Sequence, residues 1–267
     1  MSSANPLDAL SSPQAVRQAA REGHLTGPTS GLANGHVQVN LVILPEAQAN
    51  GFLRFCQANP KPCPLIAVTE PGQRGCKVLG EDLDIALDVP AYRLYRQGTS
   101  VGSVGDVVDE WRDDLVTFAL GCSFTFEHAL LQAGLRVRHI DEDRNVPMFN
   151  TSIPLTSAGG FDGKLVVSMR PFLAADAIRA IQITTRYPQV HGAPVHLGDP
   201  ALIGIPDIQA PDYGDAVSLG EGELPVFWAC GVTPQQVLLD AGVEFAITHS
   251  PGHMLVTDIP DSGLALF

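Results

Sequence analysis

The chain has 267 residues, of which 45% are hydrophobic and 17% charged; these values exclude intrinsic disorder and suit one large domain or two small ones. Twenty-nine acidic side chains against sixteen basic ones give a formal net charge of −13, so we expect neither a nucleic-acid partner nor an anionic membrane surface. The sequence shows no apolar run long enough to span a bilayer and no apolar signal-peptide region at the N-terminus, which predicts a cytoplasmic protein.

The N-terminal half predicts helices and strands in alternation. Ser12 and Pro13 are typical of an N-cap and a first helical position, and Gly23 of the end of that helix. The apolar, β-branched run 37–44 predicts a strand, the Phe-containing segment 46–59 a helix, and 65–70 a second strand. Exposed apolar strands such as 37–44 could serve an interface, so a homo-oligomer is an open alternative.

The middle of the chain predicts two successive helices, then a strand and a third helix. Residues 106–120 have a helix-like pattern with acidic residues early, and a further helix is expected to start just after Ser123 and to end at Gly134. Residues 164–171 predict a strand and 173–187 the helix that follows it. A loop-rich passage comes next.

The last unit has the clearest pattern. Residues 223–229 predict a strand, Thr233 with Gln236 a capping box, and 244–248 a second strand after the cap at Gly242. A strand–helix–strand crossover joins parallel neighbours, which predicts that Cys230 and Thr248–His249 lie on one sheet edge. The overall alternation predicts an α/β fold.

In open α/β sheets, ligands bind beyond the carboxyl ends of the strands. The segments that end there by this interpretation supply the candidate binding residues. They are Arg170; Cys230, Gly231 and Thr233; Thr248, His249 and Ser250; and, at a helix start, Ser123 with Glu127.

His249 and His253 stand four residues apart. Histidines at this spacing share a face only on a helix, and Pro251 and Gly252 interrupt any helix here, which disfavours a metal site. Two interpretations remain: histidines that hydrogen-bond the backbone around a tight turn, or His249 as a proton-transfer group.

Other candidates also leave two interpretations. Cys122 and Cys230 could be nucleophiles at helix N-termini or small packing residues, and the odd number of cysteines without C-x-x-C spacing predicts free thiols. Glu127 could be an acid or base with a raised pKa, or a solvated helix residue. Arg170 is expected to have a carboxylate partner, from the protein or from a ligand.

The passage "HGAPVHLGDP", which begins at His191, predicts a fixed loop that either contacts substrate or only connects. No G-x-G-x-x-G or P-loop motif follows a strand. We therefore expect no nucleotide cofactor and no metal.

Several segments together resemble the bacterial hydro-lyase family that is also called the D-glutamate cyclase family. The resemblance extends from about residue 17 to residue 261, and its segments are "GHVQVNLVILP", "FLRFCQANPKPCPLI", "GCSFTFEHALL", "NVPMFNTSIP", "VVSMRP", "VHGAPVHLGDPALIGIPD", "GELPVFWACGVTPQ" and "ITHSPGHMLVTDIPD". It implies two unlike α/β domains, a layered mixed sheet with helices and a smaller two-layer domain, and no obligatory cofactor. We expect residues 1–120 and 225–267 to form the larger domain and 121–224 the inserted one.

The resemblance also implies an activity: conversion of D-glutamate, a small acidic substrate, to 5-oxo-D-proline and water. We hypothesise that Arg170 holds a substrate carboxylate, His249 moves the proton and N–H groups near Gly231 or Ser123 face the oxyanion. Glu127 is the second acid or base candidate, and Thr233, Thr248, Ser250, Cys230 and His191 are expected to line the site. The alternatives are dehydration of another hydroxy acid and a small-molecule binding protein without catalysis.

Overall fold

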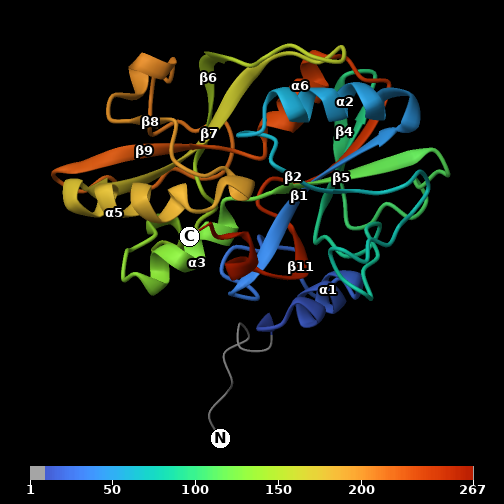
Figure 1. Cartoon of the computed structure of the whole chain (residues 1–267), viewed down its shortest axis with the longest axis horizontal. Helices are drawn as coiled ribbons and strands as arrows, with labels where there is room; N and C mark the ends of the chain where they lie inside the picture. The colour runs from blue at the N-terminus through green and yellow to red at the C-terminus, as the bar shows by residue number, and fades with distance from the viewer. Residues whose placement is uncertain (1–9, 267) are drawn as a thin grey trace, which may run out of the picture.

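The computed structural model describes residues 10–266, and these fold into two β-sheets with helices packed against them (Figure 1). The helices are α1 (Pro13–Arg21), α2 (Glu46–Ala58), α3 (Phe124–Gln132), α4 (Arg138–Asp141), α5 (Ala174–Thr185) and α6 (Thr233–Asp240), with short 3-10 helices at Pro188–Val190, Pro200–Ile203 and Asp261–Leu264. The strands are β1 (His36–Pro45), β2 (Leu65–Val68), β3 (Tyr92–Arg96), β4 (Thr99–Val104), β5 (Leu115–Gly121), β6 (Met148–Pro154), β7 (Lys164–Leu173), β8 (His196–Leu197), β9 (Glu223–Ala229), β10 (Phe245–His249) and β11 (Leu255–Pro260). The expected α/β class is confirmed.

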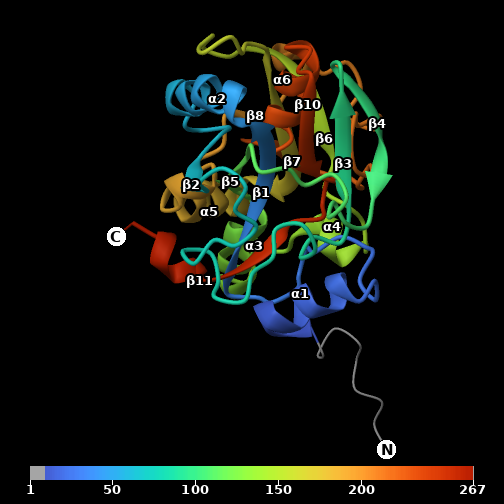
Figure 2. The same ribbon diagram turned by 90° about the vertical axis from the view of Figure 1, so that its right-hand side faces the viewer.

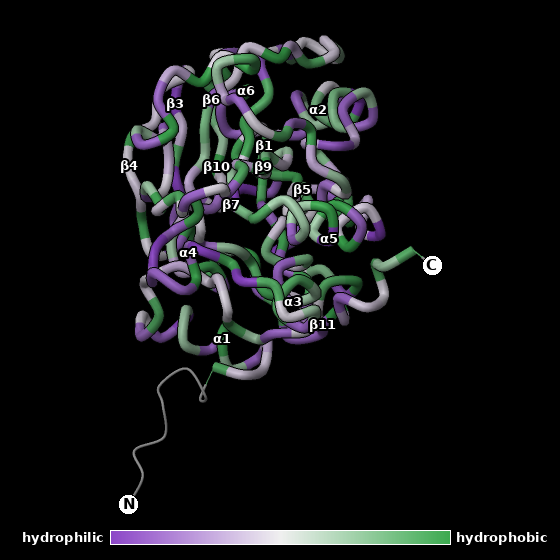
Figure 3. Tube along the Cα trace, turned by 90° about the vertical axis from the view of Figure 1, so that its left-hand side faces the viewer, coloured by the Kyte–Doolittle hydropathy of each residue, from purple (hydrophilic) through white to green (hydrophobic). Residues whose placement is uncertain are grey.

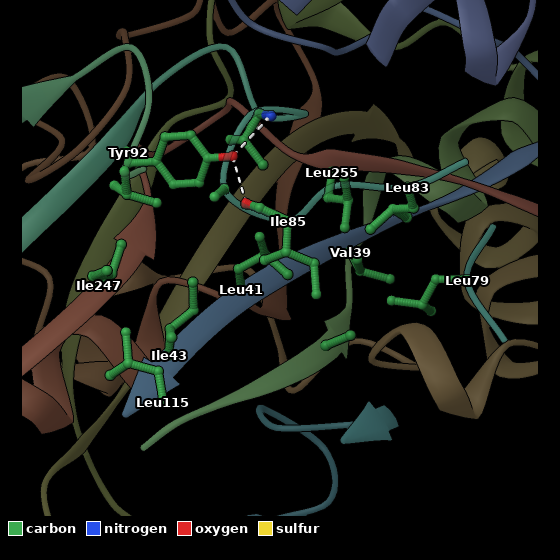
Figure 4. Packing of buried hydrophobic residues seen from close by; sticks show 14 of the residues in the cluster. Val39, Leu41, Ile43, Leu79, Leu83, Ile85, Tyr92, Leu115, Ile247 and Leu255 are labelled. Carbon is green, nitrogen blue, oxygen red and sulfur yellow. Dashed lines mark hydrogen bonds between the residues drawn. The ribbon is translucent and has the colours of Figure 1, made fainter. Parts of the chain in front are cut away.

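The larger sheet is built around β1. Its strand order is β2-β5-β1-β10-β3-β4, and β11 also pairs with β1. Side chains alternate between the two faces of a strand, so Val39, Leu41 and Ile43 face one core with Leu79 and Ile85 of the 69–90 loop (Figure 4). The opposite face of β1 packs against α2 and α6, which both lie at the top of the molecule in Figures 1 and 2.

The smaller sheet has the order β6-β7-β9-β8. One face packs against α3 and α5, where Trp228 contacts Phe126 and Phe172 with ring centroids 5.7 and 6.3 Å apart. The other face is covered by the 200–219 segment, through Ile203, Ile205 and Val217. Figure 3 shows hydrophobic stretches, in green, among the strands in the middle of the molecule.

The expected parallel crossover at residues 223–248 is wrong. The strand, helix and strand form as β9, α6 and β10, but β9 pairs with β7 in the smaller sheet and β10 pairs with β1 and β3 in the larger one. Within residues 10–266 the strand pairings are antiparallel. The division into domains stays a prediction, and its expected limit at 224/225 falls inside β9.

The expected helix at 106–120 is also wrong. Residues 115–121 form β5, which is buried along its whole length between β2 and β1. A strand covered on both faces shows a continuous apolar run, and such a run has the same hydrophobic pattern as a buried helix. Neighbouring strands, which lie far away in the sequence, decide between the two.

The helix-start signals give mixed results. Ser12 caps α1, since its side chain accepts the Ala15 N–H at 3.2 Å, as the sequence predicts. The capping box of Thr233 does not form, because the α6 N-cap is Val232. The Thr233 hydroxyl instead accepts the Val166 N–H at 3.1 Å and donates to the Val166 carbonyl at 3.2 Å, and so it joins α6 to β7. In the part of the chain that the structure describes, no helix is long and apolar enough to cross a membrane.

Candidate active site

Arg170 lies in the interior with its partners supplied by the protein. Its side chain is 0% exposed. Its Nε donates to Glu127 Oε1 at 2.9 Å, its Nη2 donates to the same oxygen and, at 3.0 Å, to Ser123 Oγ, and its Nη1 donates to Ser168 Oγ at 3.0 Å. The guanidinium also lies over the rings of Phe126 and Trp228. The carboxylate partner expected for Arg170 is therefore Glu127.

Glu127 has neither of the environments considered from its sequence. It is 2% exposed, so it is no solvated helix residue. Burial raises the pKa of its carboxyl, but His139 and Arg170 together outweigh burial and hold that pKa at about 2. Glu127 is therefore ionised across the physiological range and acts as the counter-ion of Arg170.

His249 is fully buried at the end of β10. Its Nδ1 accepts the Leu41 N–H at 3.0 Å, which fixes the proton of the neutral ring on Nε2. Burial lowers the pKa of His249 to about 3. Gln235 Nε2 donates to the His249 carbonyl at 3.0 Å, and Thr248 Oγ1 donates to the same carbonyl at 2.9 Å. His249 and Thr248 thus join β10 to β1 and α6.

His253 does not join His249 in a common site. Its ring nitrogens lie 3.0 Å from the Pro251 carbonyl and 3.2 Å from the Thr26 carbonyl. Among residues 10–266, no three histidine, cysteine or acidic side chains are arranged to hold a metal ion. The two histidines contact separate backbone groups on either side of the turn at Pro251.

Cys122, Cys230 and Gly231 are packing residues in this geometry. Burial raises the pKa of Cys122 to about 12 and that of Cys230 to about 11, so neither is a ready thiolate. A Cβ atom on Gly231 would lie 2.0 Å from Nδ2 of Asn40, which itself donates to the Gly121 carbonyl at 2.9 Å. The start of α6 therefore passes β1 at a distance that only glycine allows.

His191 lies in a different place, beside a small cavity with Lys61. Its Nδ1 contacts the Lys61 carbonyl at 2.8 Å, and its backbone is left-handed with φ of 81°. Burial lowers the pKa of His191 to about 4. The cavity beside it measures about 260 Å³.

A polar cavity of about 510 Å³ lies where the two sheets meet, a volume typical of small-molecule sites. Segments far apart in the sequence line it: Ala91 just before β3, Arg93 of β3, Ser103 of β4, Asn145, Asp212–Gly214, Ser250, Pro251 and His253. Figure 2 shows β3 and β4 at the edge of the larger sheet, with β6 of the smaller sheet nearby.

Arg93 is the cation of this cavity. It stands opposite Ser103 of β4 and Thr248 of β10 in the strand register, so the three side chains rise from one face of the sheet. The Ser103 and Ser250 hydroxyls lie 3.2 Å apart. Within residues 10–266, no carboxylate oxygen lies within 4.0 Å of the Arg93 guanidinium nitrogens. An arginine without an internal carboxylate, in a cavity lined by hydroxyls, is suited to a ligand carboxylate.

A second cavity of about 550 Å³ lies along the 68–81 segment. A single stretch of chain lines it, and its arginine, Arg74, is paired with Asp84 through Nε at 2.8 Å. It offers no comparable convergence of segments. We therefore take the cavity around Arg93 as the candidate active site.

Of the residues selected from the sequence, Ser250 lines the cavity around Arg93. The structure brings Ser123, Glu127 and Arg170 together in one buried cluster, and it places Thr248 and His249 beside the cavity on β10. Five further lining residues were not predicted from the sequence: Arg93, Ser103, Asn145, Asp212 and Tyr213. The one available signal was the start of "YRLYR", where Tyr92 and Leu94 flank Arg93; on a strand this spacing puts Arg93 on the face opposite Tyr92 and Leu94.

The fold and the cavity define the class: an α/β protein with a polar cavity where two antiparallel sheets meet, holding an arginine without an internal carboxylate. The model of the D-glutamate cyclase family matches residues 116–258, and the chain belongs to this family.

Whole-length relatives agree with this assignment. Proteins named "putative hydro-lyase" are 64% identical in Bordetella pertussis (94% of this chain, 91% of the relative), 58% in Burkholderia multivorans (98% and 100%) and 56% in Xanthobacter autotrophicus (98% and 95%). Among solved structures, a nitrogen repressor-like protein from Methanococcus jannaschii aligns at 9% identity with a TM-score of 0.35 over 93% of this chain and 98% of its own, too weak a likeness to carry an argument.

Proposed function

We propose that the protein is a hydro-lyase that converts D-glutamate to 5-oxo-D-proline and water. Membership of the D-glutamate cyclase family and the hydro-lyase names of its relatives support this activity. The observation that supports the candidate active site is that Arg93, a cation without an internal carboxylate, lines a cavity of about 510 Å³. Its guanidinium matches the planar carboxylate of the substrate in charge and shape.

The reaction makes defined demands on this cavity. The amine must lose a proton and attack the side-chain carboxyl carbon, and one oxygen of that carboxyl leaves as water. An ionised carboxylate is a poor electrophile, so the site must hold it, neutralise it and stabilise the tetrahedral oxyanion. Arg93 meets the first demand, and the hydroxyls of Ser103 and Ser250 are the donors that line the same space.

The residues selected from the sequence take supporting roles in this proposal. Arg170 has its N–H groups directed at Glu127, Ser123 and Ser168, so we assign the carboxylate-binding role to Arg93. The Arg170–Glu127 pair and His249 hold the strands and the helix behind the cavity. Ser250 keeps its expected role as a binding residue.

The test begins with EDTA-treated protein incubated with D-glutamate and with L-glutamate, with 5-oxoproline followed by chiral chromatography. We expect product from the D isomer. Arg93→Gln should lower kcat/KM by about 10- to 100-fold, the effect of removing a charged hydrogen-bond partner. Arg54→Gln, which removes a charge from the exposed surface of α2, is the matched control and should leave turnover unchanged.

Two results would contradict the proposal. Turnover of D-glutamate by folded Arg93→Gln at the wild-type rate would remove Arg93 from the site. Absence of product from either isomer would reject the cyclase activity; tight binding of unaltered D-glutamate would then favour a binding protein, and dehydration of a hydroxy acid would favour the other hydro-lyase.

A further inference from the structure

Asp212 provides a second charge in the cavity of Arg93. One of its oxygens, Oδ2, accepts the Asn150 N–H at 2.8 Å, which positions the carboxylate, and the side chain is exposed. Within residues 10–266, no arginine, lysine or histidine nitrogen lies within 4.0 Å of this carboxylate. The cavity therefore contains a cation and an anion that are paired neither with each other nor with another ionised group.

The charges of Asp212 and Arg93 both affect the pKa of the Tyr213 hydroxyl. Burial raises the pKa of the Tyr213 hydroxyl; the negative charge of Asp212 raises it further, and the positive charge of Arg93 lowers it. The hydroxyl itself donates to Gln236 Oε1 at 2.9 Å. Tyr213 lines the same cavity as both charges, and its contact with Gln236 joins it to α6.

We propose that Asp212 binds the ammonium group of the substrate, and that the cavity thereby selects amino acids over dicarboxylic acids and hydroxy acids that lack an amine. The inference rests on the proposed function, because it assigns the second polar end of the same substrate. A zwitterion can satisfy both unpaired charges at once. A dicarboxylic acid of the same length without the amine would satisfy Arg93 and place no cation at Asp212, so its binding is weaker.

The backbone contact makes Asp212 a fixed recognition group. Oδ2 is occupied by the Asn150 N–H, so Oδ1 remains to accept from the substrate. Replacement by asparagine preserves an oxygen for the Asn150 N–H and removes the charge. Asp212→Asn therefore tests binding of the ammonium group while the contact with the Asn150 N–H is kept.

The experiment compares D-glutamate with glutarate, which lacks the amine. Initial rates give KM for D-glutamate and a competitive Ki for glutarate, for the wild type, Asp212→Asn and the control Asp207→Asn. Asp207 is an exposed loop aspartate that accepts the Gln209 N–H at 2.8 Å and does not line the cavity. We expect Asp212→Asn to raise KM for D-glutamate by about tenfold, to leave or lower Ki for glutarate, and to keep Tm unchanged.

An unchanged KM in Asp212→Asn, or an equal loss for D-glutamate and glutarate, overturns the inference while the cyclase activity stands. Should the wild type form no 5-oxoproline, the proposed function fails and the same two ligands are titrated by calorimetry instead. Preference of the wild type for D-glutamate, lost in Asp212→Asn, then supports the role of Asp212. Absence of that preference overturns it.

Discussion

The ion pair between Arg170 and Glu127 lies out of contact with solvent, and its two charges depend on each other. Removing the carboxylate charge leaves a buried guanidinium with only Ser123 and Ser168 as hydroxyl partners. A buried charge without its counter-ion is strongly destabilising, whereas a buried pair replaced as a whole often costs little. Each of the two residues is therefore needed as long as the other one is present.

Glu127→Gln should lower the free energy of unfolding by about 3–5 kcal/mol, and the double variant with Arg170→Met should recover part of that loss. Urea denaturation of both single variants and the double variant gives the coupling energy. Glu110→Gln, which breaks the exposed pair with Arg96, is the control and should cost about 1 kcal/mol or less. Losses that add within about 0.5 kcal/mol would contradict the coupling.

At the scale of elements, the approach of the α6 start to β1 is set by Gly231. Asn40 occupies the space that a Cβ atom on Gly231 would need. Because Asn40 is itself bonded to the Gly121 carbonyl at the end of β5, it cannot move without losing that bond. Three elements are thus held together at one point without a side chain at position 231.

Gly231→Ala should destabilise the protein by about 1–3 kcal/mol or more through this overlap, as measured by thermal and urea unfolding. Shortening the obstacle with Asn40→Ala in the same chain should recover part of the loss. Gly263→Ala is the matched control, because a Cβ atom there meets no heavy atom within 4 Å. Equal stabilities of Gly231→Ala and Gly263→Ala would show that α6 shifts freely.

Most elements could be predicted from local patterns, and their partners could not. Ser12 with Pro13 marks the start of α1, and the β-branched run of β1 marks a strand, because propensity and capping act within a few residues. The pairing of β9 with β7, instead of with β10, depends on residues fifty or more positions apart. The same limit on prediction applies to β5. Its apolar run fits a helix or a strand, and pairing with its neighbours in the sheet makes it a strand.

The candidate site depends on the arrangement of the whole molecule. Ser250 was predicted, because it follows a strand directly. Arg93, Asp212 and Tyr213 were not, since nothing in their own segments shows that β3 of the larger sheet and the 212–214 segment beside β6 share a cavity. Cys230 and Thr248–His249 do not share the predicted parallel sheet edge, because β9 and β10 belong to different sheets; α6 contacts β10 through Gln235, which donates to the His249 carbonyl.

Two buried histidines make global stability depend on pH. The pKa of His249 falls from 6.5 to about 3 and that of His191 from 6.5 to about 4, in both cases because burial disfavours the charged ring. The unfolded chain therefore binds more protons than the folded one below pH 6.5. The stability is complete above pH 6.5 and is lost progressively as pH falls through this window toward the folded pKa values.

Between pH 7 and pH 5 we expect the free energy of unfolding to fall by about 1–2 kcal/mol for each of the two histidines. His249→Asn, which keeps an oxygen for the Leu41 N–H and cannot titrate, should lower the starting stability and remove roughly half of the pH dependence. Urea denaturation at pH 7, 6 and 5 gives both values; at these pH values folded Glu127, with its pKa of about 2, stays ionised, and most of its titration in the unfolded chain lies below pH 5. His24→Asn, at an exposed position, should retain the full slope. A slope in His249→Asn as steep as in the wild type would show that His249 is not the neutral, buried group that joins β10 to β1.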